Sequence, residues 1–127
     1  MTRKVIATAD APGAVGPYSQ AIVSDGLVFC SGQIPLDPAT GELVTGSITN
    51  ETRRCLQNLS AVLEAAAVTF DDVVKVTAFL TDMNDFTEFN EVYAEFFGDG
   101  PPARATVGVS ALPKGARVEV ECIAKKS

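Results

Sequence analysis

One stretch in the middle of the chain constrains the fold most, because it combines a long helical pattern with a strand directly after it. Apolar side chains within residues 48–66 recur at helical spacing, and a Ser, Thr or Asn within residues 47–50 is available as the helix cap. Residues 73–80 then form a nearly continuous apolar run, which is typical of a strand covered on its faces. With a strand over residues 27–31, this stretch predicts a β-α-β unit.

Shorter patterns on either side of this unit predict the remaining elements. Residues 4–8, 20–23 and 27–31 predict three strands, and the last two form a hairpin around a Ser-Asp-Gly turn. A capping-box-like start at Asp85 and a stripe of aromatic residues predict a second helix that ends at Gly98. Two more strands are predicted over residues 104–110 and 117–124.

The resulting element order is β-β-β-α-β-α-β-β, without internal repeats, linkers or low-complexity segments. A chain of 127 residues is long enough for one domain to bury a core without disulfides or metal ions. We therefore expect a single two-layer α+β domain over residues 1–127.

Composition excludes several kinds of chemistry. The sequence has no histidine, which excludes Ser-His and Cys-His nucleophile pairs and all histidine metal ligands. Its three cysteines are odd in number and widely spaced, so they fit neither a disulfide framework nor a paired-cysteine metal site. A reducing cytoplasm is the expected location.

Charge and hydropathy restrict the possible partners. The net charge is −6 and the basic residues are scattered, so phosphate-backbone binding gets no electrostatic support and no nucleic-acid partner is expected. No apolar stretch approaches the ~20 residues of a membrane span, and no membrane partner is expected. The apolar share of 46% is high for an acidic chain and hints at a face buried between subunits.

Alternation along the last two strands gives each of them a polar face. Arg104 and Thr106 share one face of the first strand, opposite Val107, and Glu119 and Glu121 share one face of the second, away from the core. On spacing alone, the preferred interpretation is a solvated sheet face with surface ion pairs rather than an active site.

Separated motifs along the chain change this interpretation. They are Gly-Pro-Tyr-Ser-Gln-Ala at 16–21, Ser-Gly-Gln-Ile-Pro at 31–35, Asn-Asp-Phe at 84–86, Pro-Ala-Arg at 102–104 and Val-Glu-Val-Glu at 118–121. With these motifs in this order, the sequence resembles the reactive intermediate imine/enamine deaminase family, also called RidA or YjgF, essentially from end to end. The resemblance implies a chorismate-mutase-like two-layer α+β sandwich, with a mixed six-stranded sheet and two helices on one face. It also implies a homotrimer with a site in each cleft between neighbouring subunits.

The resemblance assigns roles to individual residues. It makes Arg104 the residue that binds the substrate carboxylate and Glu119 the residue that positions water for catalysis. Tyr18, Ser31 and Asn90 fall on substrate-binding positions of the family. Without the resemblance, Tyr18 is as well explained as a loop anchor and Ser31 as an ordinary strand hydroxyl.

Two positions leave questions open. Many deaminating members carry a cysteine two positions after the arginine, where this sequence has Thr106, whose hydroxyl can still bind substrate or water. Glu121 shares a face with Glu119, so the sequence leaves open which of the two carboxylates positions the water.

The activity implied by the resemblance is that of a cytoplasmic 2-iminobutanoate/2-iminopropanoate deaminase. Such an enzyme hydrolyses reactive 2-imino acids to 2-oxo acids and ammonia, in the service of metabolite damage control. The reaction requires no metal or organic cofactor, because an imine is already activated toward water. Two alternatives stay open: an endoribonuclease or translation inhibitor, as ascribed to some members of the family, and a non-catalytic protein that binds small carboxylates or acts as a holdase.

Overall fold

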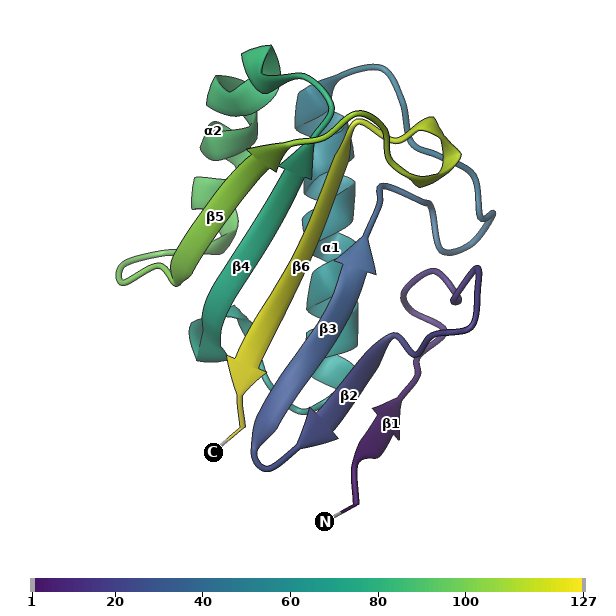
Figure 1. Ribbon diagram of the computed structural model, residues 1–127, viewed down its shortest axis with the longest axis vertical. Helices are drawn as coiled ribbons and strands as arrows, with labels where there is room; N and C mark the ends of the chain where they lie inside the picture. The colour runs from purple at the N-terminus through teal and green to yellow at the C-terminus, as the bar shows by residue number, and fades with distance from the viewer. Residues whose placement is uncertain (1, 127) are drawn as a thin grey trace.

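The computed structural model describes residues 2–126 as a six-stranded mixed sheet covered on one face by two helices (Figure 1). The predicted two-layer α+β architecture, with both helices on the same face, is thereby confirmed. The helices are α1 (Ile48–Ala65) and α2 (Phe86–Phe96). The strands are β1 (Lys4–Ile6), β2 (Ala21–Ser24), β3 (Leu27–Gln33), β4 (Val73–Leu80), β5 (Ala103–Gly108) and β6 (Val118–Lys125).

The strand order across the sheet is β1-β2-β3-β6-β4-β5, in which β4 and β5 are parallel and all other neighbours are antiparallel. The predicted β-α-β unit consists of β3, α1 and β4, but its two strands are not neighbours, because β6 is inserted between them. β5 and β6, which follow one another in the sequence, flank β4 instead of pairing with each other. Because β4 pairs with both strands, it determines which face of the sheet each side chain of β5 and β6 points to.

α1 forms where the sequence predicts a helix, and it is capped as expected. The Ser47 hydroxyl accepts a hydrogen bond from the Asn50 backbone N–H at 3.1 Å, so Ser47 is the cap among the candidate residues. The helix ends at Ala65, and Ala67 beyond it has a φ of 63°, the left-handed conformation that follows many helices. The fully buried residues of α1 include Cys55, Leu56, Leu59, Val62 and Leu63.

The start of α2 differs from the prediction. Asp85 precedes the helix, but its side chain makes no capping hydrogen bond. The Asp82 carboxylate instead accepts a hydrogen bond from the Asn84 backbone N–H at 2.9 Å and caps the 3₁₀ turn η2 (Met83–Asp85), which runs directly into α2. The predicted capping box at Asp85 was therefore wrong. Asp85 already has a helical backbone, whereas a capping residue needs an extended one.

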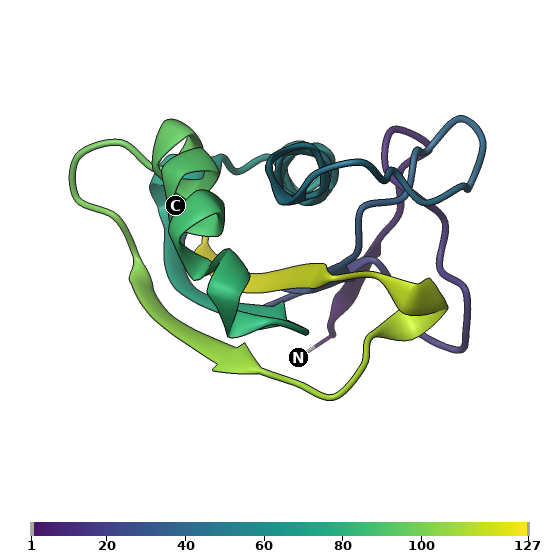
Figure 2. The same ribbon diagram turned by 90° about the horizontal axis from the view of Figure 1, so that it is seen from above.

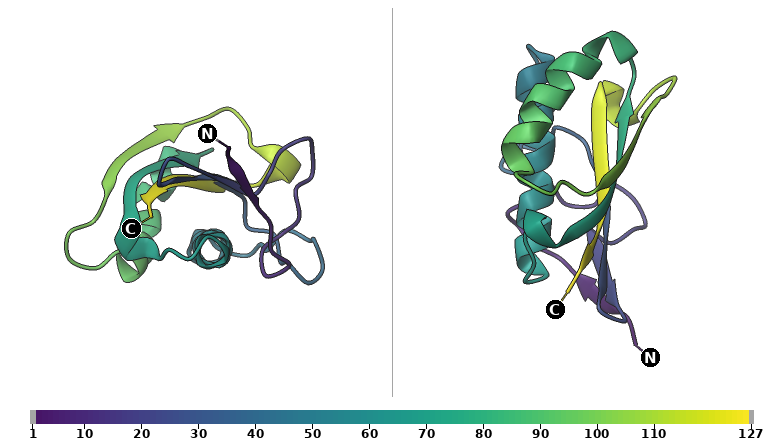
Figure 3. Two further views of the ribbon diagram at one scale, coloured as in Figure 1. Left: turned by 90° about the horizontal axis from the view of Figure 1, so that it is seen from below. Right: turned by 90° about the vertical axis from the view of Figure 1, so that its left-hand side faces the viewer.

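The two helices divide the sheet between them. α1 packs on β3 and β6, while α2 packs beside α1 and lies over the β4–β5 end (Figures 1 and 2). The opposite sheet face carries no helix, and the sheet curves strongly toward the β5 edge (Figure 3). Across residues 2–126, neither helix combines the length and the apolar content that crossing a bilayer requires.

Candidate functional site

The pairing of β4 with β5 fixes the direction of the predicted arginine. Arg104 and Thr106 pair with Val76 and Ala78 of β4, which are fully buried beneath the helices. Residues paired across neighbouring strands point to the same face, so Arg104 and Thr106 face the helical layer. Val107, which points the other way, is 40% exposed. The expectation that Arg104 and Thr106 lie on a solvated sheet face was therefore wrong, because the polar side of β5 is turned toward α2.

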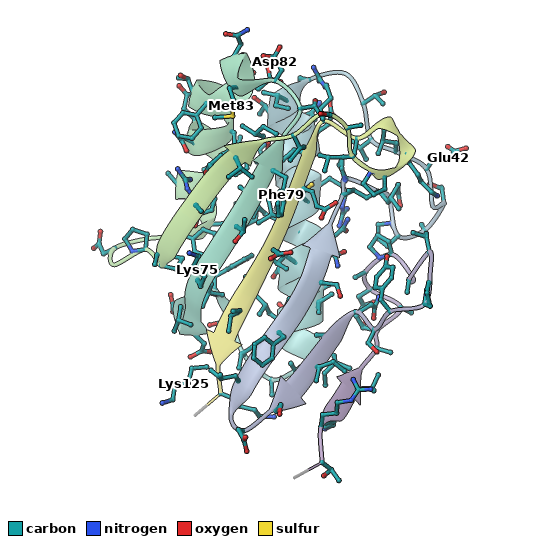
Figure 4. All side chains as sticks on the ribbon, in the orientation of Figure 1. Glu42, Lys75, Phe79, Asp82, Met83 and Lys125 are labelled. Carbon is teal, nitrogen blue, oxygen red and sulfur yellow. The ribbon has the colours of Figure 1, made fainter. Side chains whose placement is uncertain are left out.

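The two glutamates lie on the opposite face of the sheet. Glu119 and Glu121 pair with Phe79 and Thr77 of β4, which alternate with the buried residues of that strand. Figure 4 shows Phe79 on the face that is turned away from the helices. The glutamates point away from the core, as the alternation predicted, and Glu119 is half-buried whereas Glu121 is exposed.

Arg104 lies against the aromatic stripe of α2. Its guanidinium carbon is 4.6 Å from the centre of the Tyr93 ring and 5.7 Å from the centres of the Phe86 and Phe89 rings. At such distances a cation is attracted to the negative face of an aromatic ring, and we call these three rings the aromatic cage. Within residues 2–126, no carboxylate forms an ion pair with Arg104, so its N–H groups are left to bind another anion.

Polar atoms without partners gather in the same region. Asn90 Oδ1, the Tyr93 hydroxyl and Thr106 Oγ1 are buried and have no hydrogen-bond partner in the described part of the chain. Each unpaired buried group costs ~1–3 kcal/mol, so a ligand or a partner subunit that supplies hydrogen bonds here is favoured. We call Arg104, Asn90 and Thr106 the arginine cluster. The adjoining depression, of about 510 Å³, is lined by Tyr93, Ala94, Phe97, Gly98, Pro101, Pro102 and Arg104.

The other predicted site residues form a second group, which we call the glutamate cluster: Tyr18, Ser31, Glu119 and Glu121. They line a depression of about 330 Å³ on the uncovered sheet face, together with Gly32 and Pro113. The Ser31 hydroxyl donates a hydrogen bond to the Ser19 carbonyl at 2.6 Å, which ties β3 to the loop that carries the tyrosine.

Gly32 makes room for the Glu119 carboxylate. A Cβ atom at position 32 would lie only 2.2 Å from Glu119 Oε2, so the carboxylate occupies its place only because residue 32 is glycine. The pairing of β3 with β6 is irregular between Cys30 and Gln33, where β3 carries one residue more than β6. Sequence reasoning assigned no role to Gly32, although an isolated glycine within a strand is a known signal of a bulge or a close approach.

The loop that carries Tyr18 is fixed by the side chain of Gln20. The Gln20 amide donates hydrogen bonds to the carbonyls of Thr8 at 3.1 Å and Pro12 at 2.8 Å, and it accepts one from the Thr8 N–H at 2.7 Å. The Tyr18 hydroxyl accepts a hydrogen bond from the Val15 N–H at 3.3 Å, and the side chain is 47% exposed. Gln20 was also missed as a residue that shapes the site, since a polar residue at a strand start gives no signal of burial.

The electrostatic environment distinguishes Glu119 from an ordinary surface carboxylate. Burial raises the pKa of Glu119 above its usual range, and the negative charge of Glu121 raises it further. In the described chain no basic side chain forms an ion pair with Glu119. A carboxyl group with a raised pKa both accepts and returns protons more readily near neutral pH, which suits it to general acid and base chemistry.

The structure therefore gathers the predicted site residues into two clusters rather than one. The arginine cluster lies on the helical side of the sheet and the glutamate cluster on the uncovered side. Within one copy of the chain the sheet itself separates them.

Comparison with known proteins places this geometry in a family. A family model described as Endoribonuclease L-PSP matches residues 8–126. A RutC family protein of Pyrococcus horikoshii is 54% identical over 124 residues, which cover 98% of each chain. The human 2-iminobutanoate/2-iminopropanoate deaminase is 48% identical over 98% of this chain and 90% of its own. The crystal structure of E. coli TdcF with bound serine has a TM-score of 0.93 at 43% identity, over 98% of this chain and 99% of that one.

These similarities and the fold define the class of protein first: a small α+β protein with a mixed six-stranded sheet and two helices on one face. The chain belongs to the Endoribonuclease L-PSP family, the family of the RidA and YjgF proteins.

Proposed function

We propose that this chain is a 2-iminobutanoate/2-iminopropanoate deaminase, which hydrolyses reactive 2-imino acids to 2-oxo acids and ammonia. The observation that carries the proposal is Arg104, a cation without an ion-pair partner in residues 2–126 that borders a depression beside buried, unsatisfied polar atoms. A planar guanidinium binds a carboxylate through two parallel hydrogen bonds, and every 2-imino acid carries such a carboxylate. The name of the human relative supports the same activity.

We further propose that the complete site forms between subunits of a homotrimer. Because the arginine and glutamate clusters lie on opposite faces of one sheet, only two copies of the chain can bring them together. The uncovered face offers apolar side chains for such contacts, among them Phe29 at 41% and Val107 at 40% exposure. In this arrangement, the arginine cluster of one subunit faces the glutamate cluster of its neighbour.

The chemistry then divides between the two subunits. Arg104 holds the substrate carboxylate, while Asn90 and Thr106 offer hydrogen bonds to the rest of the ligand. Glu119 of the neighbouring subunit takes a proton from a water molecule as the water adds to the imine carbon, and it passes the proton to the imine nitrogen, which gives a carbinolamine. In the same way it then moves the proton of the carbinolamine hydroxyl to the nitrogen, so that the C–N bond breaks, the C=O bond of the 2-oxo acid forms and ammonia leaves. Tyr18 closes the site from the loop side.

Each binding residue of the glutamate cluster also has a place in this scheme. Ser31 lies next to the glycine that makes room for the proposed catalytic carboxylate, and it lines the same depression. Burial, helped by the charge of Glu121, raises the pKa of Glu119, whereas Glu121 is exposed, so Glu119 rather than Glu121 is the proposed catalytic carboxylate. The three cysteines in the described chain are free and buried, which supports a cytoplasmic location.

The alternative functions require different features of the molecule. An endoribonuclease needs a basic surface to hold the phosphate backbone, and the net charge of −6 opposes this. A small-carboxylate binding protein needs Arg104 but not Glu119. The bound serine in E. coli TdcF supports a small amino-acid-like ligand and is compatible with either binding or turnover.

An imine-trapping assay tests the proposal. An amino-acid oxidase generates 2-imino acids in the presence of semicarbazide, and a deaminase lowers the rate at which semicarbazone forms. We expect the wild-type protein to lower this rate strongly, Arg104→Lys to do so partly, and Arg104→Ala to leave it near the uncatalysed value. Equal activity of wild type and a folded Arg104→Ala variant would show that Arg104 takes no part in the mechanism. An inactive wild type would contradict the deaminase proposal and favour a protein that only binds small carboxylates.

A further inference from the structure

The aromatic cage, formed by Phe86, Phe89 and Tyr93, contacts the Arg104 guanidinium from the helical side. The Arg104 side chain makes no ion pair within residues 2–126, and the Tyr93 hydroxyl lies close enough to it for a polar contact. Of the three rings, Tyr93 is nearest, at 4.6 Å from the guanidinium carbon compared with 5.7 Å for the other two. The orientation of the guanidinium plane therefore depends most on the Tyr93 ring.

The Tyr93 ring is itself held in place. It stacks on Phe97 with 4.4 Å between ring centres and 26° between ring planes. Phe97 in turn packs edge-on against Phe70 at 4.8 Å, and all three rings belong to or border the hydrophobic core. Tyr93 is only 6% exposed, so its ring has little freedom to turn. The packing of Phe70 on Phe97 and of Phe97 on Tyr93 thus keeps the ring beside Arg104 in a fixed position.

The hydroxyl group of Tyr93 does not explain why this ring is there. The oxygen is buried and has no hydrogen-bond partner in the described chain. Burial raises the pKa of Tyr93, while the charge of Arg104 and its polar contact with the phenol oxygen oppose the rise, so the phenol stays neutral beside the cation. The ring face, 4.6 Å from the guanidinium carbon, is therefore the best-defined contact of Tyr93 with Arg104, and the Tyr93→Phe variant separates it from the contact of the hydroxyl.

We propose that Tyr93 is a positioning residue for the carboxylate-binding site: its ring face fixes the plane of the Arg104 guanidinium, so that both N–H groups of the fork meet the substrate carboxylate at once. The inference rests on the proposed function for the identity of the anion. Tyr93 belongs to the hydrophobic core, but in this arrangement its ring also contributes to ligand recognition. Asn90 and Thr106 are the proposed ligand contacts of the arginine cluster, whereas the ring of Tyr93 acts through Arg104.

The test compares ring removal with hydroxyl removal. Tyr93→Leu removes the ring face, Tyr93→Phe keeps it, and Phe70→Leu is the matched control that weakens the same ring stack without contacting Arg104. Each variant is made in the wild-type background and in the Arg104→Lys background, which has a cation at residue 104 but no planar guanidinium group. Binding of 2-oxobutanoate, the 2-oxo acid product, is measured by calorimetry, imine hydrolysis is measured by trapping, and folding is checked by thermal melting.

A positioning role predicts a specific pattern of non-additivity. Tyr93→Leu weakens 2-oxobutanoate binding about tenfold when residue 104 is arginine and no more than about twofold when it is lysine. Tyr93→Phe keeps the ring face, so it should retain most of the affinity that Tyr93→Leu loses, and it should melt at the same or a higher temperature because it removes a buried hydroxyl without a hydrogen-bond partner in the described chain. Phe70→Leu lowers the melting temperature but changes binding by the same small factor in both backgrounds.

Three outcomes would overturn the inference. Equal weakening by Tyr93→Leu in both backgrounds would show that the ring serves only the core. Loss of binding in Tyr93→Phe would make the hydroxyl a direct ligand contact, and unchanged binding in a folded Tyr93→Leu would leave the ring without any role in recognition. Failure of the proposed deaminase is separate: wild type would then bind 2-oxobutanoate without hydrolysing imines, and the binding pattern would still decide the role of Tyr93.

Discussion

Replacing Gly32 with alanine tests how the structure holds the Glu119 carboxylate. The new Cβ would lie 2.2 Å from Oε2, 2.8 Å from Cδ and 3.1 Å from Cγ of Glu119. Ordinary contact distances begin near 3.4 Å, so the carboxylate must move by about 1 Å, and the far end of a flexible side chain can do this without disturbing the backbone. The substitution thus displaces the proposed catalytic group while leaving the fold intact.

The two expected magnitudes differ widely. A displacement of about 1 Å at a catalytic group lowers kcat by about 100-fold, because the carboxylate no longer meets the water and the departing nitrogen in line. The free energy of unfolding should change by less than about 1 kcal/mol, since the lower entropy of the unfolded alanine chain offsets the cost of moving the carboxylate. Gly32 does not adopt the left-handed backbone conformation that disfavours alanine.

Imine trapping gives kcat, and urea denaturation gives the free energy of unfolding. Gly13→Ala is the matched control, because a Cβ atom there would meet nothing within 4 Å and should leave kcat unchanged. In a Glu119→Gln background, Gly32→Ala should cause little further loss, since both changes act on the same group. Unchanged kcat in a folded Gly32→Ala variant, or a full additional loss in the Glu119→Gln background, would refute this reasoning.

Two further predictions concern stability. Burial and the Glu121 charge raise the pKa of Glu119 in the folded protein, so its ionised form disfavours folding and Glu119→Gln should stabilise the protein at pH 7. In urea titrations this gain should shrink as the pH falls through the raised pKa and be gone near the ordinary carboxyl value of about 4.5. Arg117→Met should cost about 2 kcal/mol in the same assay, because it leaves the Glu51 carboxylate, which is 2% exposed, without its partner. Arg53→Met, which breaks an exposed ion pair, should cost less than about 1 kcal/mol; equal costs would contradict the account.

The layers of the fold could be predicted from the sequence because they follow from periodicity. Helical spacing within residues 48–66 and the apolar run at residues 73–80 each identify an element without reference to the rest of the molecule. The insertion of β6 between β3 and β4 could not be predicted in this way, since strand order depends on contacts between distant segments. The start of α2 was wrong at Asp85 because the preceding turn η2 takes over the capping.

The site was harder to predict because alternation does not say which face of a strand is covered. Arg104 and Thr106 alternate with apolar residues, and such a pattern normally turns the polar side to solvent. On β5 the polar side faces α2, where aromatic rings stabilise the guanidinium. Helical spacing identified the aromatic stripe of α2, but it could not show that Tyr93 also contacts the arginine. Periodicity reports burial, whereas this contact depends on tertiary packing.

Mixed trimers test the central claim, that each site combines Arg104 of one subunit with Glu119 of its neighbour. Arg104→Ala and Glu119→Gln chains are unfolded together in equal amounts, refolded, and assayed by imine trapping. If the residues act across the interface, about one quarter of the sites in a randomly mixed trimer receive both intact residues, so activity should rise from near zero to about 25% of wild type.

The matching control mixes wild type with the double variant Arg104→Ala/Glu119→Gln in equal amounts. Sites shared between subunits predict about 25% of wild-type activity for this mixture, whereas sites within one subunit predict about 50%. The account predicts about 25% in both mixtures. It would be contradicted if the mixture of single variants stayed as inactive as its parents while the control mixture gave about half of the wild-type rate.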